Sequence, residues 1–419
     1  MTGGRPARLV LLAVLAAAIA APAPTASQAA SGVGAPLAPW TPGTLDFHQI
    51  STGRGNSALA VLPDGTTLLV DAGAVGDGLA IPDTEPRPDA SRRAGDWIAR
   101  YIQHMLGPGR ARLDYAVLTH FHADHMGQVT SASPESADGA YKLTGITEVG
   151  DRIPVSIMID RGDDFLPPAA TDRTFANYQA FLADQARTRH LIAERIRVGR
   201  ADQIVLRRDA ARYPTVEVRN VAADGDVWTG SGNDIRHVFP PLDSLAREDQ
   251  PSENMCSIGL RVRYGRFDLF TGGDMPGVPD AGAPEWQSVE APVARAIGPT
   301  DVHVVNHHGS ISPESPFFLS TLRSAVMILP SWSPTHPSQD VLKRLLTMRL
   351  YPGPHDVFAT LLREPTRVSI GSRSRQLKAG HGHIVVRVAP GGDSYRVFVL
   401  DDTSESYRVT AEFGPYRSR

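Results

Sequence analysis

Hydrophobic positions in this chain form short runs that come in pairs. Residues 57–62 and 66–70 are apolar runs separated by Pro63-Asp64-Gly65, a pattern typical of a β-hairpin. The same arrangement recurs at 257–270 around Tyr264-Gly265 and at 384–400 around residues 390–392. Single strands are predicted at 115–118, 155–159, 302–305 and 326–329.

Helical spacing occurs between these groups of strands. Helices are predicted at 96–106, at 177–195 and from an N-cap at Ser338 to Thr347. This alternation favours a layered α/β architecture over a β-sandwich or a helical bundle. We expect one hydrolase domain over residues 45–419. Two further segments are predicted from composition: a proline-rich linker at 30–44 and an inserted, partly helical segment at about 131–250.

The first 29 residues have the pattern of a secretory signal peptide. Arg5 and Arg8 precede an uncharged apolar run at 9–21, and Ser27-Gln28-Ala29 has the spacing of a cleavage site. The run is short for a membrane span and no stop-transfer flank follows, which disfavours the alternative of a membrane anchor. We therefore expect a secreted, periplasmic or cell-surface protein without stable membrane insertion.

Composition narrows the possible chemistry. The 419 residues are 42% hydrophobic and 21% charged, which excludes a disordered or multi-span membrane protein. Without residues 1–29, 40 Lys and Arg oppose 45 Asp and Glu, so a net charge of −5 gives no indication of nucleic-acid binding by bulk charge. The arginine-rich stretch 195–212 is either a solvated face or a docking surface for an anionic substrate. Cys256 is the single cysteine, so any metal site must use histidine and carboxylate.

The densest group of potential metal ligands follows the strand predicted at 115–118. His120-x-His122-x-Asp124-His125 places four such side chains within six residues. Residues two apart in an extended segment point the same way, so His120 and His122 can bind one ion while Asp124 and His125 face a second. Imidazole and carboxylate together suit zinc, manganese or iron better than calcium.

Three further motifs accompany this cluster. Asp71 ends a predicted strand, Asp274 lies in Thr271-Gly272-Gly273-Asp274, and His308 lies in Asn306-His307-His308-Gly309-Ser310. In this order the four motifs resemble the metallo-β-lactamase superfamily, over about residues 56–345. The resemblance implies an α/β fold, a four-layer αββα sandwich with a two-metal site at one edge, and Asp71 orienting a ligand histidine. It also implies two divalent metal ions, zinc in the first place and manganese in the second, held by His120, His122, Asp124, His125, Asp274 and His308.

The late motif, followed by His336-Pro337-Ser338, is most similar to the ComEC-like branch of that superfamily. It is also similar to secreted teichoic-acid phosphorylcholine esterases. Many members have another histidine between the cluster and the bridging aspartate, whereas this chain has Ser252-Glu253-Asn254-Met255-Cys256-Ser257 there. Asn254 is either a weak ligand or a turn residue at the start of a strand.

Other histidines leave alternatives open. His307 either hydrogen-bonds the substrate or takes the place of His308 as the ligand, and we favour His308 as the ligand. His336 either faces the substrate or caps the following helix. His381 and His383 repeat the His-x-His spacing without an acidic neighbour or a preceding buried strand, so we expect loop residues there.

The sequence therefore predicts a secreted dinuclear metal-dependent hydrolase. Two cations lower the pKa of a bridging water, which gives hydroxide at neutral pH, and both stabilise the oxyanion that develops. We expect Asp124, Asp71, His307 and His336 to act in catalysis. The expected partner is a small or polymeric anionic substrate, first a phosphodiester of extracellular nucleic acid or of the cell wall, with nucleic acid as substrate only. The alternatives are hydrolysis of a lactone, thioester or β-lactam, and a binding module without catalysis.

Overall fold

The computed structural model describes residues 1–4, 32–82, 84–163, 173–278 and 283–419. The chain divides into two units, residues 1–30 and 31–419, and every element below lies in the second unit. The segment predicted as a signal peptide lies outside the described residues, apart from its first four. Within the part that is described, no helix has the length and apolar character needed to cross a membrane.

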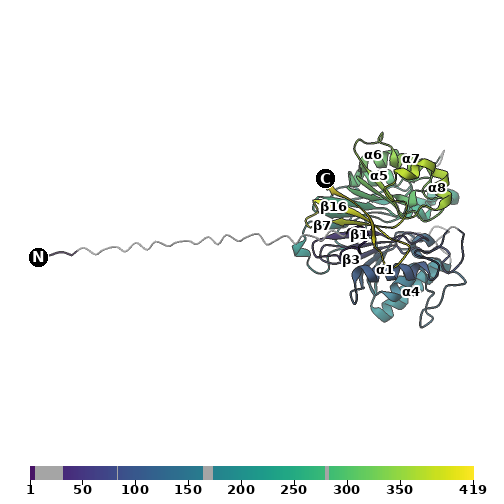
Figure 1. Cartoon of the computed structure of the whole chain (residues 1–419), viewed down its shortest axis with the longest axis horizontal. Coiled ribbons are helices and arrows are strands. Elements are labelled where there is room, and N and C mark those ends of the chain that lie inside the picture. Colours follow the sequence, from purple (N-terminus) through teal and green to yellow (C-terminus); the bar gives the residue numbers. More distant parts are fainter. Residues whose placement is uncertain (5–31, 83, 164–172, 279–282) are drawn as a thin grey trace. The chain divides into compact units, whose positions relative to one another are not determined.

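Two large mixed β-sheets form the centre of residues 31–419 (Figure 1). Within the described ranges, one sheet has nine strands in the spatial order β17 (Val409–Arg417), β16 (Ser394–Leu400), β15 (His383–Val388), β1 (Leu45–Gln49), β2 (Ala58–Val61), β3 (Thr67–Val70), β4 (Leu113–Val117), β5 (Val155–Asp160) and β6 (Ile192–Arg195). In the same ranges the other sheet has eight, in the order β14 (Asp356–Ala359), β13 (Val326–Leu329), β12 (Val302–Val304), β11 (Phe267–Thr271), β10 (Gly259–Tyr264), β7 (Val216–Ala223), β8 (Asp226–Trp228) and β9 (Ile235–His237).

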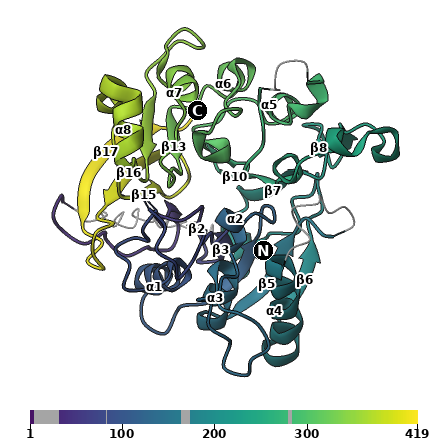
Figure 2. The ribbon, with the colours of Figure 1, turned by 90° about the vertical axis from the view of Figure 1, so that its right-hand side faces the viewer.

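Helices cover the outer face of each sheet, which gives four layers (Figure 2). The first sheet packs against α1 (Ala94–Leu106), α3 (Gly145–Arg152) and α4 (Arg173–Arg189). The second sheet packs against α5 (Glu290–Ile297), α6 (Pro316–Leu322), α7 (Gln339–Leu346) and α8 (Glu364–Ile370). The αββα sandwich expected from the sequence is therefore confirmed.

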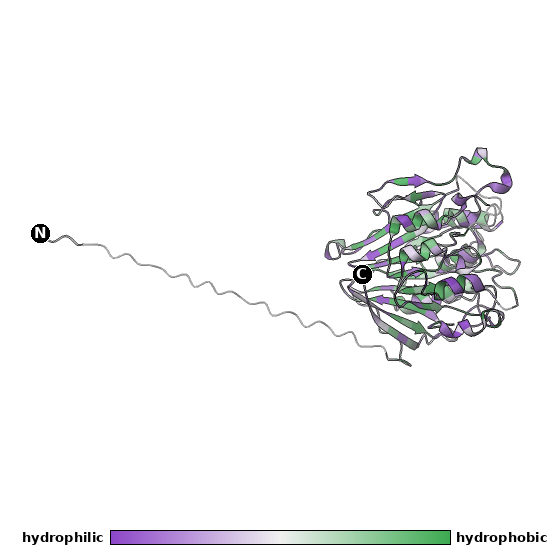
Figure 3. Cartoon of the chain, turned by 90° about the horizontal axis from the view of Figure 1, so that it is seen from above, coloured by the Kyte–Doolittle hydropathy of each residue, from purple (hydrophilic) through white to green (hydrophobic). Residues whose placement is uncertain are grey.

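Alternating side chains on the strands fill the space between these layers. In β1, Leu45 and Phe47 enter the core between the two sheets, whereas His48 contacts Tyr101 of α1 on the opposite face. In β11, Leu269 enters the same inter-sheet core and Phe270 packs toward α5 and α6. Figure 3 shows the result as largely hydrophobic strands inside the folded unit. Burial of this apolar surface, at roughly 25 cal/mol per Å², is the main favourable term for the fold.

The predicted hairpins are present as β2–β3, β10–β11 and β15–β16. The helix predicted at 177–195 ends earlier, because α4 stops at Arg189 and Ile192–Arg195 pairs in parallel with β5 as β6. The stretch 131–250 differs from an insertion, since its strands β5 to β9 pair within the two main sheets. The predicted linker also contacts the domain, where Gly34 donates its N–H to the carbonyl of Val409 at 2.8 Å.

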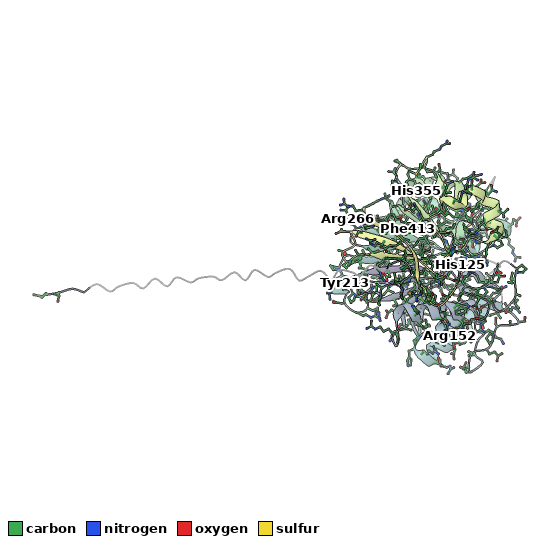
Figure 4. All side chains as sticks on the ribbon, in the orientation of Figure 1. His125, Arg152, Tyr213, Arg266, His355 and Phe413 are labelled. Atoms are coloured by element: carbon green, nitrogen blue, oxygen red, sulfur yellow. The ribbon has the colours of Figure 1, made fainter. Side chains whose placement is uncertain are left out.

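Strand direction brings the four sequence motifs to one edge of the sandwich. β3 and β4 are parallel neighbours in one sheet, and β11 and β12 are parallel neighbours in the other. Residues that follow these strands therefore emerge on the same side. Asp71 follows β3, residues 118–125 follow β4, Asp274 follows β11, and residues 306–309 follow β12. Figure 4 shows His125 at the side of the folded unit away from Tyr213 and Arg266.

Candidate metal centre

Four side chains from both sheets form a closed cluster: Asp124, His125, Asp274 and His308. Nε2 of His125 lies 3.0 Å from Oδ1 of Asp274 and 3.2 Å from Nε2 of His308. The same nitrogen of His308 lies 3.1 Å from Oδ2 of Asp124 and 3.4 Å from Oδ1 of Asp274. A tetrahedron with metal–ligand bonds of about 2.0–2.1 Å has edges of about 3.3–3.4 Å, so the spacing of these atoms suits one small cation.

A second cluster shares Asp274 and, among the residues that the structure describes, contains two other groups, His120 and His122. Nε2 of His120 lies 3.1 Å from Nδ1 of His122 and 3.8 Å from Oδ2 of Asp274. The two carboxylate oxygens of Asp274 thus face different clusters. The structure brings together all six residues expected as ligands, in the pairing that the sequence predicted.

The donors in these clusters suit a transition metal. Asp274 is buried, yet its Oδ1 has no hydrogen-bond partner within the described residues. Buried polar atoms are normally satisfied, and an acceptor left without a donor beside two imidazole nitrogens is the arrangement that a cation satisfies. Burial alone would raise the pKa of Asp274, but the nearby His125 and His308 hold it well below its ordinary value. The carboxylate is therefore in the form that binds metal.

Asp71 fixes the orientation of His125 from the side away from the cluster. Its Oδ2 lies 2.7 Å from Nδ1 of His125, which leaves Nε2 of that ring facing Asp274. Asp71 also accepts hydrogen bonds from the Thr119 backbone at 2.8 Å and from Asn56 Nδ2 at 2.9 Å. Asp71 adopts a positive φ of 60° immediately after β3, a conformation that turns the chain toward the site. The orienting role expected for Asp71 agrees with these contacts.

A turn with two left-handed residues positions His308. His307 has φ 47° and His308 has φ 52°, and each such residue costs on the order of 1–3 kcal/mol unless its surroundings hold it. Glu314 accepts the backbone N–H of Asn306 at 3.1 Å, and Glu290 accepts the Asn306 side-chain amide at 2.9 Å. These two fully buried carboxyl groups lie beneath the turn and anchor its first residue.

Glu290 also anchors the chain that follows the turn. It accepts the backbone N–H groups of Glu314 at 2.7 Å and Ser315 at 2.9 Å. The outward ring nitrogen of His308 is satisfied as well, because Nδ1 lies 3.0 Å from the carbonyl of Pro330. Neither glutamate was singled out in the sequence, since the role of each depends on tertiary contacts that its neighbours in the chain do not reveal.

A buried ion pair supports the histidine loop and joins Arg161, which follows β5 of the same sheet, to Glu253, which precedes β10 of the other sheet. Arg161 donates to both carboxylate oxygens of Glu253, at 2.9 and 2.7 Å. Glu253 also accepts the backbone N–H of Phe121 at 2.8 Å. The sequence signal that could have identified Arg161 is a charged residue directly after a buried strand, the same position that Asp71 occupies.

Three polar side chains flank the clusters without belonging to either one. His307 lies with Nε2 3.8 Å from Oδ2 of Asp274 and 3.2 Å from the Asn254 amide nitrogen. His336 stacks on His308, with ring centroids 5.0 Å apart. Its buried Nδ1 has no hydrogen-bond partner among the described residues. The geometry therefore favours His308 over His307 for the four-group cluster, and places Asn254 beside His307.

Of the two histidines expected as loop residues, His381 and His383, one departs from the sequence prediction. His383 is not a loop residue, because it is the buried first residue of β15 and its Nδ1 accepts the backbone N–H of Ser51 at 3.1 Å. Burial lowers the pKa of His383 to about 4. His381, two residues earlier, is exposed and lines a separate cleft described below.

Comparison with known proteins agrees with this description. Residues 51–131 match the family model of the Metallo-beta-lactamase superfamily. The two mixed sheets with outer helices are consistent with the metallo-β-lactamase fold. The matched segment includes Asp71 and the whole 120–125 cluster, whereas Asp274 and His308 lie beyond it. No sequence match was found among curated proteins.

Several solved structures are similar to the chain at low sequence identity. Zn(2+)-bound PqqB from Methylobacterium extorquens has a TM-score of 0.36 and 13% identity, over 79% of this chain and 86% of that one. A mutant of the CmlA β-hydroxylase has a TM-score of 0.34 and 13% identity, over 84% of this chain and 54% of that one. A protein of unknown function from Enterococcus faecalis V583 has a TM-score of 0.28 and 10% identity, over 75% of this chain and 70% of that one.

Proposed function

We propose that this protein is a secreted, dinuclear metal-dependent hydrolase that acts on a phosphodiester. The observation that carries the proposal is the position of Asp274, whose Oδ1 faces one ligand cluster while its Oδ2 faces the other. A carboxylate shared in this way suits two cations at the short separation typical of two-metal hydrolases. The histidine and carboxylate donors of the two clusters support zinc as the first metal to test.

When bound, two divalent cations would supply an acidified water as nucleophile and neutralise negative charge on a phosphoryl group. The chain's own residues divide the remaining work. Asp71 holds His125 in one orientation, and Asp124 lies within hydrogen-bonding distance of His308. His307 and His336 lie beside the clusters, where they can contact the substrate or pass a proton to a leaving group.

Unequal ligand numbers favour the three-group cluster as the place where the substrate enters. Structural metal sites use four protein ligands, whereas catalytic sites commonly keep three and leave a position for water or substrate. Burial does not separate the clusters, because each has one half-buried member, His122 in the three-group cluster and Asp124 in the four-group cluster. Asn254 and His307 line this side and are suited to hold the entering group by hydrogen bonds.

A phosphodiester is the preferred substrate class because its charge is neutralised by two cations, and the similarity of the late motifs to ComEC-like proteins supports it. Hydrolysis of a lactone, thioester or β-lactam remains the alternative, since the same nucleophile can attack a carbonyl carbon. A chromogenic panel distinguishes them: cleavage of bis(p-nitrophenyl) phosphate without cleavage of nitrocefin or a lactone supports the proposal, and the reverse pattern overturns it. Absence of bound metal, with no activity on adding zinc or manganese, would support the silent binding module instead.

Secretion is a separate part of the proposal. It rests on the basic start, the apolar run at 9–21 and the cleavage-site pattern at 27–29. Expression of the full chain in a secreting bacterial host should release a protein that begins at Ala30. Recovery of the uncleaved chain in the cell pellet would contradict this part without affecting the metal site.

A further inference from the structure

A polar cleft of about 420 Å³ opens on the same edge of the sandwich as the metal clusters. Its wall includes Leu361 and Arg363, which follow β14, and Asp402, which follows β16. β14 is parallel to β13, and β13 is parallel to β12, so residue 363 and His308 emerge on the same side. The cleft is therefore a neighbour of the catalytic edge and not part of the ligand clusters.

Arg363 connects the cleft to the metal centre. Its Nε donates to the carbonyl of Trp332 at 3.1 Å, and the indole of Trp332 packs edge-on against His308 with ring centroids 6.0 Å apart. Arg363 also donates to the carbonyl of Gly53 at 2.9 Å and pairs with Glu85 at 3.1 Å. One residue thus separates the lining of the cleft from a ligand histidine, and the charge of Glu85 is already balanced.

Asp402 holds two cationic side chains at the base of the cleft. It is buried, and its Oδ2 accepts the Ser51 hydroxyl at 2.8 Å and lies 3.8 Å from Nε of Arg87. Its Oδ1 lies 3.7 Å from Nδ1 of His381. Contact with Asp402 raises the pKa of His381, whereas the charges of Arg367 and Arg87 oppose that rise. The cleft is lined by four basic side chains, Arg87, Arg363, Arg367 and His381, beside the carboxylates of Glu85, Glu364 and Asp402.

Arg367 is the cation without a carboxylate partner. Its Nε donates to the carbonyl of Leu362 at 3.1 Å, and no carboxylate in the described part of the chain forms an ion pair with its guanidinium. Glu364 also lines the cleft and is exposed, so it is the acidic group that would oppose an incoming anion. Arginine binds phosphate through paired N–H groups that match two oxygens, which makes Arg367 and Arg87 suitable recognition groups.

We propose that this cleft binds a second phosphate of a substrate whose scissile phosphodiester lies at the metal clusters. The substrate is then a repeating phosphodiester polymer, and Arg367 with Arg87 and His381 determines the preference for polymer over a single diester. This inference rests on the proposed phosphodiesterase function, which it extends from a bond type to a substrate class.

The test compares one short and two long substrates on the metal-loaded full chain. Bis(p-nitrophenyl) phosphate has one phosphate and therefore no second phosphate to place in the cleft, whereas a short oligodeoxynucleotide and poly(glycerol phosphate) have many. Arg367→Ala should raise KM for the preferred polymer about tenfold, the loss expected for one charge-assisted hydrogen bond, with kcat unchanged. The same variant should leave both constants for bis(p-nitrophenyl) phosphate unchanged. The polymer that shows the effect identifies the source of the phosphate.

Two matched variants sharpen the result. Glu364→Gln removes the opposing carboxylate and should lower KM for the polymer, the opposite direction from Arg367→Ala. Arg375→Ala removes an exposed arginine of the same segment that does not line the cleft, and should change nothing. Equal effects of Arg367→Ala and Arg375→Ala, or equal effects of Arg367→Ala on short and long substrates, would overturn the inference.

Failure of the proposed function is distinguishable from failure of the cleft. If the wild-type protein cleaves no phosphodiester, binding of a fluorescent oligodeoxynucleotide and of labelled poly(glycerol phosphate) to the metal-free protein still tests the cleft by anisotropy. Weaker binding of either polymer by Arg367→Ala than by Arg375→Ala supports the cleft in that case. Unchanged binding of both polymers overturns it.

Discussion

The two halves of the metal centre are built in different ways. The half on the first sheet takes His120, His122, Asp124 and His125 from one short loop after β4. The half on the second sheet takes single residues from two loops, Asp274 after β11 and His308 after β12. The first half is therefore local in sequence, whereas the second exists only when β11 and β12 pair.

The side chains that hold the ligands in place also differ between the two halves. His125 is held by one carboxylate, Asp71, which comes from the neighbouring strand of the same sheet. His308 is held by a strained turn whose first residue is anchored on Glu314 and Glu290. Both halves rest on buried charged groups, since Glu253 also anchors the backbone of the histidine loop at Phe121. The difference is that His308 needs this support to hold a left-handed backbone.

The largest effect is expected where the halves meet. Asp274→Ala removes the one anionic group that both clusters share and leaves two cations in mutual repulsion. We expect loss of most bound metal and of nearly all turnover, while the protein remains folded because β11 is held by apolar residues such as Phe267 and Leu269. Metal content measured beside turnover tests this expectation.

His336→Ala is the matched control for that loss. His336 stacks on His308 but belongs to neither ligand cluster among the described residues. Its removal should leave the metal content unchanged and lower the rate on the order of a hundredfold, as expected for one catalytic contact. If His336→Ala also empties a metal site, His336 is a ligand and the division between ligands and substrate-facing residues is wrong.

Variants that each remove one ligand from a single cluster separate the metal affinity of the two clusters. His308→Ala reduces the four-group cluster to three groups, whereas His122→Ala reduces the three-group cluster to two. We expect His122→Ala to retain about one tightly bound ion per chain, held by the four-group cluster. His308→Ala should bind its remaining metal more weakly than His122→Ala does. Metal titration with a chelating indicator decides between them, and the opposite order of affinity would contradict the assignment of the closed cluster.

The same contrast explains what sequence could predict. The histidine cluster at 120–125 and the hairpins are local patterns that could be predicted from spacing, whereas Asp71, Asp274 and His308 were expected from the resemblance to the metallo-β-lactamase superfamily. Glu290, Glu314 and Glu253 act through partners that lie at least eight residues away, and no local pattern marks them. Arg161 directly follows a buried strand, but its partner Glu253 is distant in the chain. The strand at 155–159 was predicted, but its place in a main sheet was not, and the exposed edge strands β6 and β9 lack a strong apolar alternation.

Smaller effects are expected from the supporting carboxylates. Asp71→Ala frees the ring of His125, and Glu314→Ala frees the backbone of Asn306, so each should weaken metal binding by about 10–100-fold. Glu314→Gln keeps an acceptor for the Asn306 N–H and should restore most of the affinity lost in Glu314→Ala. Competition against a chelator measures these constants. Wild-type metal affinity in Glu314→Ala, with only a lower free energy of unfolding, would show that the turn does not depend on this carboxylate.

The smallest expected effect is on stability, and it comes from two buried carboxyl groups, those of Asp77 and Glu290. Burial raises the pKa of Asp77, in the loop after β3, to about 7, and burial with the charge of Glu314 raises the pKa of Glu290 to about 8. Asp77 accepts one N–H, from Ala94 at 2.9 Å, and its other oxygen has no partner among the described residues. Glu290 accepts three N–H groups with both oxygens. Neutral replacements of these two side chains should therefore change the free energy of unfolding in opposite directions.

For Asp77 the folded pKa lies above the unfolded value of 3.8, so the folded chain holds the proton more tightly. Its contribution to stability is complete below pH 3.8 and is lost as the pH rises to about 7. Asp77→Asn keeps the hydrogen bond to Ala94 without the charge, and should raise the free energy of unfolding at pH 8 on the order of 1–2 kcal/mol, with no difference near pH 4. Glu290→Gln places an amide N–H₂ against backbone donors, so it should lower the free energy of unfolding both at pH 8 and near pH 4. Urea unfolding of the metal-free variants at the two pH values measures this, and a Glu290→Gln protein as stable as wild type would mean that the turn tolerates the loss of an acceptor beneath it.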